Sequence, residues 1–293
     1  MKFSDVVDLV ALSALWGASF LFMRIAAPEF GPLVLVEVRV LIAAIFLLPI
    51  FLLRADVSEL TSNWKKLSIL SVMNSAAPFF LLTFATLSIT GGFAGILNAT
   101  APIWAAMIAW VWLSDRFSLS RILGLLIGFA GVLLLVWNKV SLSFDGTTVA
   151  ILAGILAAVL YAIGGNYTKK HMSGMHPLAI ATGSMIAAAI ILLPVAVYLW
   201  PSAMPSLRSW IAVIIMGIAS TGVAYILYFR LIRNVGPAKA ITVTYLIPAF
   251  AMLWGYIFID EKVTPIMIVG CSVIFLGTAL ATGMLSFGRG RGF

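Results

Sequence analysis

Two polar side chains, Asn98 and Thr244, stand within apolar stretches, and each precedes a proline, Pro102 or Pro248, by four residues. Because a proline has no backbone N–H, it leaves the carbonyl four residues earlier in a helix without its hydrogen bond. In a membrane such a carbonyl needs a partner in protein, water or ligand. The pattern predicts two polar binding positions with hinges at the prolines. Alternatively, the prolines only kink the helices, and Asn98 and Thr244 tie neighbouring helices together.

Asn74 and Pro78 repeat this spacing in another apolar stretch, and aromatic residues add further candidates. Trp16 falls at the centre of an apolar run, although membrane proteins concentrate Trp and Tyr near the bilayer surfaces. It either fills the core or lines a cavity, where an indole stacks on a ring or holds a cation. The predicted binding residues are Trp16, Asn74, Asn98, Thr100, Tyr161, Tyr225, Thr244 and Tyr245. The predicted hinges are Pro78, Pro102 and Pro248.

The composition places these residues in a membrane protein. Of the 293 residues, 63% are hydrophobic and 10% are charged, whereas soluble domains have roughly 45–50% apolar and 25% charged residues. The formal charge of +8 comes from basic residues in short loops, which favours a role in orientation over nucleic-acid binding. The lone Cys271 excludes a disulfide framework and a cysteine-rich metal site. We expect no metal, no cofactor and no nucleic-acid partner.

Ten apolar runs are long enough to cross a bilayer as helices. These solid runs lack the alternation of barrel strands. We therefore expect an all-α membrane protein whose surroundings are the lipid bilayer. The predicted spans are 6–26, 33–53, 67–88, 91–113, 119–137, 147–168, 177–199, 209–232, 236–258 and 265–286.

Lysines and arginines fall mainly on one side of this arrangement. With loops assigned alternately to the two sides, the cations opposite the N-terminus are Arg24, Arg39, Lys139, Arg208 and Lys262, and all others lie on its own side. Cytoplasmic loops carry an excess of Lys and Arg. Both termini are therefore predicted to be cytoplasmic.

An internal repeat divides the chain into two halves, residues 1–140 and 141–293. Pro32 matches Pro177 at an offset of 145 residues, and the prolines of the fourth and ninth spans match at an offset of 146. Each half has five spans, and because five is odd, the second half must enter the membrane inverted. Inverted repeats are typical of transporters, in which a central site between the halves is exposed to the two sides alternately.

Charged residues near the predicted span ends are interpreted as peripheral. Glu37 and Arg39 lie within two turns of a span end and are an external gate at best. The matched cations Arg24 and Lys169 either attract a carboxylate at each entrance or extend to lipid headgroups. No carboxylate falls at a span centre and both histidines share one loop, whereas proton-driven transporters usually bury an acid or a histidine relay. We therefore expect facilitated movement down a gradient.

Several motifs occur together in a recognisable order: the run Ala14–Phe20, the Asn98–Pro102 stretch, acidic Asp115 and Glu261 after the fourth and ninth spans, and glycine-spaced fifth and tenth spans. In this order they resemble the EamA family of the drug/metabolite transporter superfamily, above all its YddG-type amino-acid exporters. The resemblance covers essentially the whole chain. It implies ten helices, cytoplasmic termini and a central cavity formed by the first, third, fourth, sixth, eighth and ninth helices. It also implies export of amino acids or related metabolites across a bacterial inner membrane.

A cavity with Trp, Tyr, Asn and Thr but no deep charge suits a small zwitterion with an apolar or aromatic side chain. The expected function is export of small metabolites, most of all aromatic or other neutral amino acids, by a monomer or homodimer. The alternatives are export of other metabolites or drugs, an intramembrane enzyme and a channel. An enzyme would need a nucleophile with a base, and the sequence has neither a mid-span histidine nor a G-x-S-x-G motif. A channel would predict a charged or carbonyl-lined pore.

Overall fold

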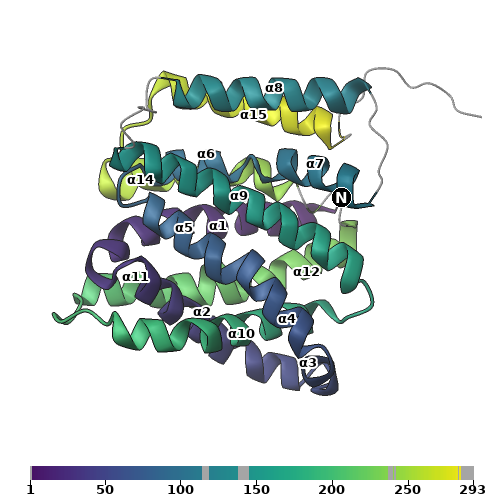
Figure 1. Cartoon of the computed structure of the whole chain (residues 1–293), viewed down its shortest axis with the longest axis vertical. Coiled ribbons are helices and arrows are strands. Elements are labelled where there is room, and N and C mark those ends of the chain that lie inside the picture. The colour runs from purple at the N-terminus through teal and green to yellow at the C-terminus, as the bar shows by residue number, and fades with distance from the viewer. Residues whose placement is uncertain are drawn as a thin grey trace, which may run out of the picture.

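The computed structural model describes residues 2–113, 119–137, 145–236, 240, 242–282 and 284. Every regular element in these residues is a helix (Figure 1). Outside the described residues lie Asp115, Lys139, the predicted boundary between residues 140 and 141, and parts of the predicted spans 236–258 and 265–286.

The helices of the first half are α1 (Phe3–Phe30), α2 (Pro32–Leu52), α3 (Ser58–Ser62), α4 (Trp64–Ser71), the π-helical turn η1 (Val72–Ala76), α5 (Ala77–Ala85), α6 (Gly91–Asn98), α7 (Ala101–Leu113) and α8 (Leu119–Val136). Those of the second half are α9 (Gly146–His171), α10 (Pro177–Tyr198), α11 (Leu207–Gly217), the π-helical turn η2 (Ile218–Val223), α12 (Ala224–Val235), α14 (Val243–Ile259) and α15 (Pro265–Ala281).

These elements form the ten predicted spans. Eight helical stretches are long and apolar enough to cross a membrane, and the two shorter apolar helices α14 and α15 complete the set. Three of the long stretches are composite: α4, η1 and α5 run together, as do α6 with α7, and α11 with η2 and α12. The prediction of an all-α membrane protein with ten spans is confirmed.

Proline and glycine set several helix boundaries. Pro32, Pro177 and Pro265 stand in the first turns of α2, α10 and α15. Their missing N–H leaves no helical bond unmade there, because first-turn N–H groups have no acceptor within the helix. Gly31 separates α1 from α2 with a φ of +72°, a conformation that glycine adopts without a steric penalty. These boundaries therefore follow from residue types that the sequence displays directly.

The two halves pack as a pseudo-symmetric pair. Three helices pack against their own repeat counterparts: α2 against α10, α6 against α14, and α8 against α15. Other contacts come in reciprocal pairs, because α1 packs against α11 and α14 while α9 packs against α5, α6 and α7. Since each half contributes five crossings, the second half is inverted relative to the first, and a shared space lies between them.

Helices α8 and α15 form a separate layer at one edge of the bundle, at the top of Figure 1. Their backbones approach so closely that only glycine fits. A Cβ atom added to Gly124 would lie 2.3 Å from the backbone nitrogen of Ala281, and one added to Gly277 would lie 2.3 Å from that of Gly128. Small residues at helix interfaces allow such contact in membranes. The glycine-spaced faces of α8 and α15 therefore pack against each other within one chain.

Polar contacts tie α1 to the second half near both of its ends. Near its C-terminal end, the Arg24 Nε lies 3.3 Å from the Glu261 Oε1, and the same carboxylate accepts hydrogen bonds from the Gly91 N–H at 2.9 and 3.0 Å. Near its N-terminal end, Asp8 pairs with Arg230 of α12. Arg24 thus has a protein carboxylate as its partner, and lipid headgroups are not needed to explain its charge.

Candidate functional site

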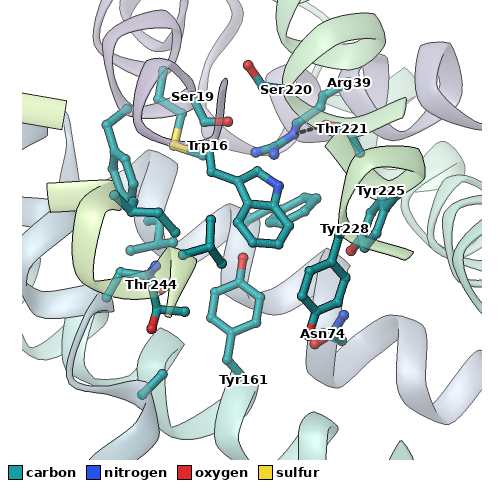
Figure 2. Close-up of a pocket in the computed structure, with 18 residues that line it drawn as sticks. Trp16, Ser19, Arg39, Asn74, Tyr161, Ser220, Thr221, Tyr225, Tyr228 and Thr244 are labelled. Atoms are coloured by element: carbon teal, nitrogen blue, oxygen red, sulfur yellow. Dashed lines mark hydrogen bonds between the residues drawn. The ribbon is translucent and has the colours of Figure 1, made fainter. Parts of the chain in front are cut away.

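A cavity of about 280 Å³ lies between the two halves (Figure 2). The first half lines it with Trp16, Ser19, Phe20, Met23, Arg39, Asn74, Phe79, Leu82, Asn98 and Ala101. The second half lines it with Tyr161, Ser220, Thr221, Tyr225, Tyr228, Val243, Thr244 and Ile247. All six helices that the family resemblance implied therefore contribute, and α2 contributes as well through Arg39.

The π-helical turns η1 and η2 both contribute to the cavity lining, η1 through Asn74 and η2 through Ser220 and Thr221. They begin at Val72 and Ile218, which are matched at the 146-residue offset of the repeat. In η1 the Ala77 N–H bonds to the carbonyl five residues back, just before Pro78, which cannot donate a bond. In η2 the Thr221 Oγ1 donates to the Met216 carbonyl at 3.0 Å. Such turns often occur at functional sites because they interrupt the regular hydrogen-bond ladder.

Aromatic rings from both halves form much of the wall. Figure 2 shows Trp16 of α1 and Tyr161 of α9, matched residues of the repeat, pointing toward one another across the cavity. Tyr161 also packs near Phe79, with ring centroids 6.4 Å apart. Tyr228 of α12 lies beside Trp16. The cavity thus offers flat apolar surfaces on which a ring or an aliphatic chain can pack.

Arg39 lies in the lining of the central cavity, whereas the sequence interpretation placed it at the periphery as an external gate at best. Its side chain is buried, lines the cavity, and donates from Nε to the Thr221 Oγ1 at 3.0 Å. The guanidinium carbon lies 3.7 Å from the centroid of the Phe79 ring. Depth along a span does not reveal which face a residue takes, and Arg39 lies on the face of α2 that packs against α5 and η2. The expectation of a cavity without deep charge was therefore wrong.

Glu37 lies two residues before Arg39 and outside the cavity lining. It is buried, and neither carboxylate oxygen has a hydrogen-bond partner among the described residues. Residues two apart on a helix point in nearly opposite directions. Glu37 therefore does not neutralise Arg39, and among the described lining residues Arg39 is the one formal charge.

Asn98 and Thr244, the matched polar pair, both line the cavity. Asn98 is the last residue of α6, and the helix resumes as α7 at Ala101, so the span breaks just before Pro102. Its Oδ1 is buried without a hydrogen-bond partner among the described residues. By contrast, α14 continues as a helix through Pro248. The proposed proline hinges therefore differ in local structure between the two halves.

The structure brings six of the eight predicted binding residues into the cavity lining and leaves Thr100 and Tyr245 outside it. Thr100 lies in the break between α6 and α7, where its Oγ1 donates to the Leu97 carbonyl at 2.7 Å and accepts from the Trp104 Nε1 at 3.2 Å. The Tyr245 hydroxyl faces α15, 3.4 Å from the Thr282 Oγ1. Both groups have partners within the protein.

Arg39 is the charged lining residue that sequence reasoning missed as a binding candidate. A signal for it existed: at the 145-residue offset its counterpart in the second half is Ser184, which is uncharged. A charge that one half has and the other half replaces by a small neutral residue points away from a shared scaffold role. It indicates instead a role in the site that only the first half provides.

The family assignment follows from a match over both halves. The model of the EamA-like transporter family matches residues 6–137 and again residues 148–283. The chain belongs to the EamA-like transporter family. It is a multi-pass membrane transporter and not an enzyme, and the two matches agree with two inverted five-helix halves.

Relatives of this EamA transporter align over nearly their whole length. The uncharacterized transporter YoaV of Bacillus subtilis is 23% identical, over 94% of this chain and 96% of YoaV. The uncharacterized inner membrane transporter YedA of Escherichia coli K12 is 25% identical, over 96% of this chain and 93% of YedA. A solved crystal structure with 18% identity superposes with a TM-score of 0.67, over 97% of this chain and 99% of the other. At that identity the superposition shows a shared fold.

Proposed function

We propose that this EamA transporter exports small metabolites, principally aromatic and other neutral amino acids, across a bacterial inner membrane, as YddG-type exporters do. The observation that carries this proposal is a cavity of about 280 Å³ whose walls combine aromatic rings and polar groups from both halves. This volume lies just below the roughly 300–1,000 Å³ typical of ligand pockets, which favours a single small metabolite over a bulky drug. The inner-membrane assignment is supported by the similarity to YedA.

In this proposal the substrate binds between Trp16 and Tyr161, beside the polar side chains at the π-helical turn and the helix break. The substrate-binding residues are Trp16, Asn74, Asn98, Tyr161, Tyr225 and Thr244, all of which line the cavity. The aromatic rings hold the substrate side chain, and the amide and hydroxyl groups hold its polar end. Thr100 and Tyr245 act through the shape of their helices, because both are bonded away from the cavity.

Transport proceeds by alternating access, in which one half rocks against the other around the central site. Pro78, Pro102 and Pro248 provide the hinges in the spans that line the cavity. The contacts of α1 with Glu261 and with Arg230, near its two ends, connect the halves, so they form and break alternately as the cavity opens to either side. Loop charges predict that both termini are cytoplasmic, and in this proposal the end with Glu261 therefore faces the periplasm.

We further propose that transport is facilitated movement down the substrate gradient. Among the described residues that line the cavity there is no Asp, Glu or His, the groups that usually carry a proton relay through a membrane. The unit is a monomer or a homodimer, divided into halves at residues 1–140 and 141–293, and it uses no cofactor.

The test is growth of bacteria that express the protein in the presence of toxic analogues such as 4-fluorophenylalanine. We expect the wild type to raise tolerance to aromatic analogues, whereas a Trp16→Ala, Tyr161→Ala double variant present at equal abundance does not. Unchanged tolerance to a panel of amino acids and analogues, with the protein present in the membrane, would contradict amino-acid export and favour another class of metabolite.

A further inference from the structure

The cavity lining includes the buried, charged Arg39, which a pocket that binds only the apolar side chain of a substrate would not require. We propose that Arg39 binds the carboxylate of the substrate, so that the transported class is small carboxylic acids with an apolar side chain. This inference rests on the proposed transport function and deepens it. It names the group that distinguishes an amino acid from its amine or amide.

The guanidinium of Arg39 is oriented so that one of its edges is available to bind a ligand. The Arg39 Nε is occupied by the Thr221 Oγ1 at 3.0 Å, and one face of the guanidinium covers the Phe79 ring. Its Nη1 is buried without a hydrogen-bond partner among the described residues. Figure 2 shows the group directed into the cavity near Trp16. Because Nε is occupied, the free edge is the one formed by the two terminal nitrogens, which matches the two oxygens of a carboxylate.

The energetics of burial favour an anionic partner. A buried charge is costly unless another charge and hydrogen bonds compensate it. No carboxylate among the described residues lies within ion-pair distance of Arg39, and Glu37 lies on nearly the opposite side of α2. The Phe79 ring gives a cation–π contact but accepts no conventional hydrogen bond. The free terminal nitrogens therefore find their partner in the ligand.

A purely structural role explains less of the geometry. Arg39 connects α2 to η2, but the Nε bond to Thr221 already makes this connection. The matched helix α10 packs in the equivalent place with Ser184, so the packing of this helix does not depend on a charge. A connection between helices also does not explain why a buried donor of a cavity-lining residue has no hydrogen-bond partner among the described residues.

The rest of the lining complements a carboxylate at Arg39. Trp16, Tyr161 and Tyr228 supply surfaces for an apolar side chain, and the buried Asn98 Oδ1 is an acceptor without a partner among the described residues. An ammonium group donates hydrogen bonds and needs such acceptors. An α-amino acid carries a group of each kind, a carboxylate for Arg39 and an ammonium for such an acceptor, whereas a decarboxylated amine leaves Arg39 uncompensated.

The test compares four probes that share one phenyl side chain: L-phenylalanine, 3-phenylpropionate, phenethylamine and L-phenylalaninamide. Uptake of each is measured in proteoliposomes, and binding is measured by the rise in melting temperature of the purified protein. We expect the wild type to bind the two carboxylates at least tenfold more tightly than the amine and the amide. Arg39→Gln should weaken binding of both carboxylates by about 30-fold or more and leave the amine unchanged or improved, because loss of one partner of a buried charged contact acts on that contact.

The exposed Arg208 provides the matched control, since Arg208→Gln removes the same charge from a residue outside the cavity lining. Arg39→Lys keeps the charge but lacks the paired donors, and should retain an intermediate preference for carboxylates. An equal loss for all four probes in Arg39→Gln would show a structural role and overturn the proposal. The comparison of the four probes with the wild type does not depend on whether a variant folds. Equal affinity of the wild type for L-phenylalanine and its amide would also overturn the proposal.

The outcomes separate this inference from the proposed function. If the wild type takes up 3-phenylpropionate but no amino acid, and Arg39→Gln abolishes this uptake, amino-acid export is wrong and the carboxylate site at Arg39 stands. If it takes up L-phenylalanine and phenethylamine equally well, with Arg39→Gln leaving their ratio unchanged, amino-acid export stands and the carboxylate site is wrong. Uptake of neither carboxylate overturns the inference.

Discussion

The Trp16 ring of α1 and the Tyr228 ring of α12 pack with centroids 5.3 Å apart and their planes tilted by 52°. Trp16 belongs to the first half of the chain and Tyr228 to the second, so the contact crosses the interface that has to change during transport. Both rings also line the cavity. A substrate ring inserted beside them would add to an aromatic cluster that already exists.

Trp16→Ala should raise the KM for L-phenylalanine about tenfold, because an aromatic contact contributes roughly 0.5–1.5 kcal/mol beyond the apolar area that it covers. L-valine, which has no ring, should be affected less. The measurement is saturable uptake in proteoliposomes. Trp137→Ala is the control, since that side chain is 77% exposed. Equal changes for both substrates would argue that Trp16 only fills space.

The ion pair between Arg24 and Glu261 should help to keep the cavity closed at that end. Arg24 is partly exposed, so the pair is worth roughly 0.5–1 kcal/mol. Access is measured with an Asn74→Cys variant in a Cys271→Ala background, which removes the only native cysteine. The reagent is an impermeant maleimide added outside. Glu261→Gln should raise the labelling of Cys at position 74 about two- to fivefold.

Asp56→Asn serves as the control for this labelling, because it removes an acid from the loop between α2 and α3, far from Glu261 along the chain. Asp8→Asn loosens the contact at the other end of α1 and should lower external labelling. Labelling that does not respond to Glu261→Gln would show that this contact does not control access.

Close packing of α8 against α15 predicts a sharp difference between two glycines. Gly124→Ala places a Cβ 2.3 Å from backbone, whereas Gly165→Ala on α9 meets nothing within 4 Å. The first substitution should destabilise the protein by about 1–3 kcal/mol. The second should be neutral or stabilising by up to about 1 kcal/mol, since alanine favours a helix over glycine. Thermal midpoints of the purified variants decide this. Similar midpoints would contradict the tight α8–α15 contact.

A pH gradient alone should not drive accumulation of L-phenylalanine in proteoliposomes, because no acid or histidine occurs among the described lining residues. Glu37→Gln should leave facilitated uptake unchanged, since Glu37 is outside that lining. Uphill accumulation that follows an imposed pH gradient and disappears in Glu37→Gln would instead identify Glu37 as a proton-carrying group, and the proposal of facilitated movement would be wrong.

The architecture was predictable because its signals are local. Solid apolar runs mark the spans, first-turn prolines such as Pro32 and Pro177 mark helix starts, and matched prolines reveal the repeat. Inversion then follows from the odd number of spans in each half. The π-helical turn η1 has a sequence signal in Pro78. The matched position in the second half is Ala224, so no proline there predicts the π-helical turn η2.

The faces of the helices were less predictable. A span that is apolar all round has no polar stripe from which to determine its orientation. Thr244 and Tyr245 are neighbours in the sequence, yet one faces the cavity and the other faces α15. Arg39 was placed correctly along the span, but its position in the cavity lining was missed, because its contacts with Thr221 and Phe79 come from residues distant in the sequence.

The most direct test of the transport account is counterflow in proteoliposomes loaded with unlabelled L-phenylalanine and given a trace of labelled L-phenylalanine outside. We expect a transient accumulation of label that saturates with concentration and is lost in the Trp16→Ala, Tyr161→Ala double variant. Label that enters without saturation, or that never exceeds the outside concentration although the reconstituted protein is folded, would contradict a carrier for aromatic amino acids.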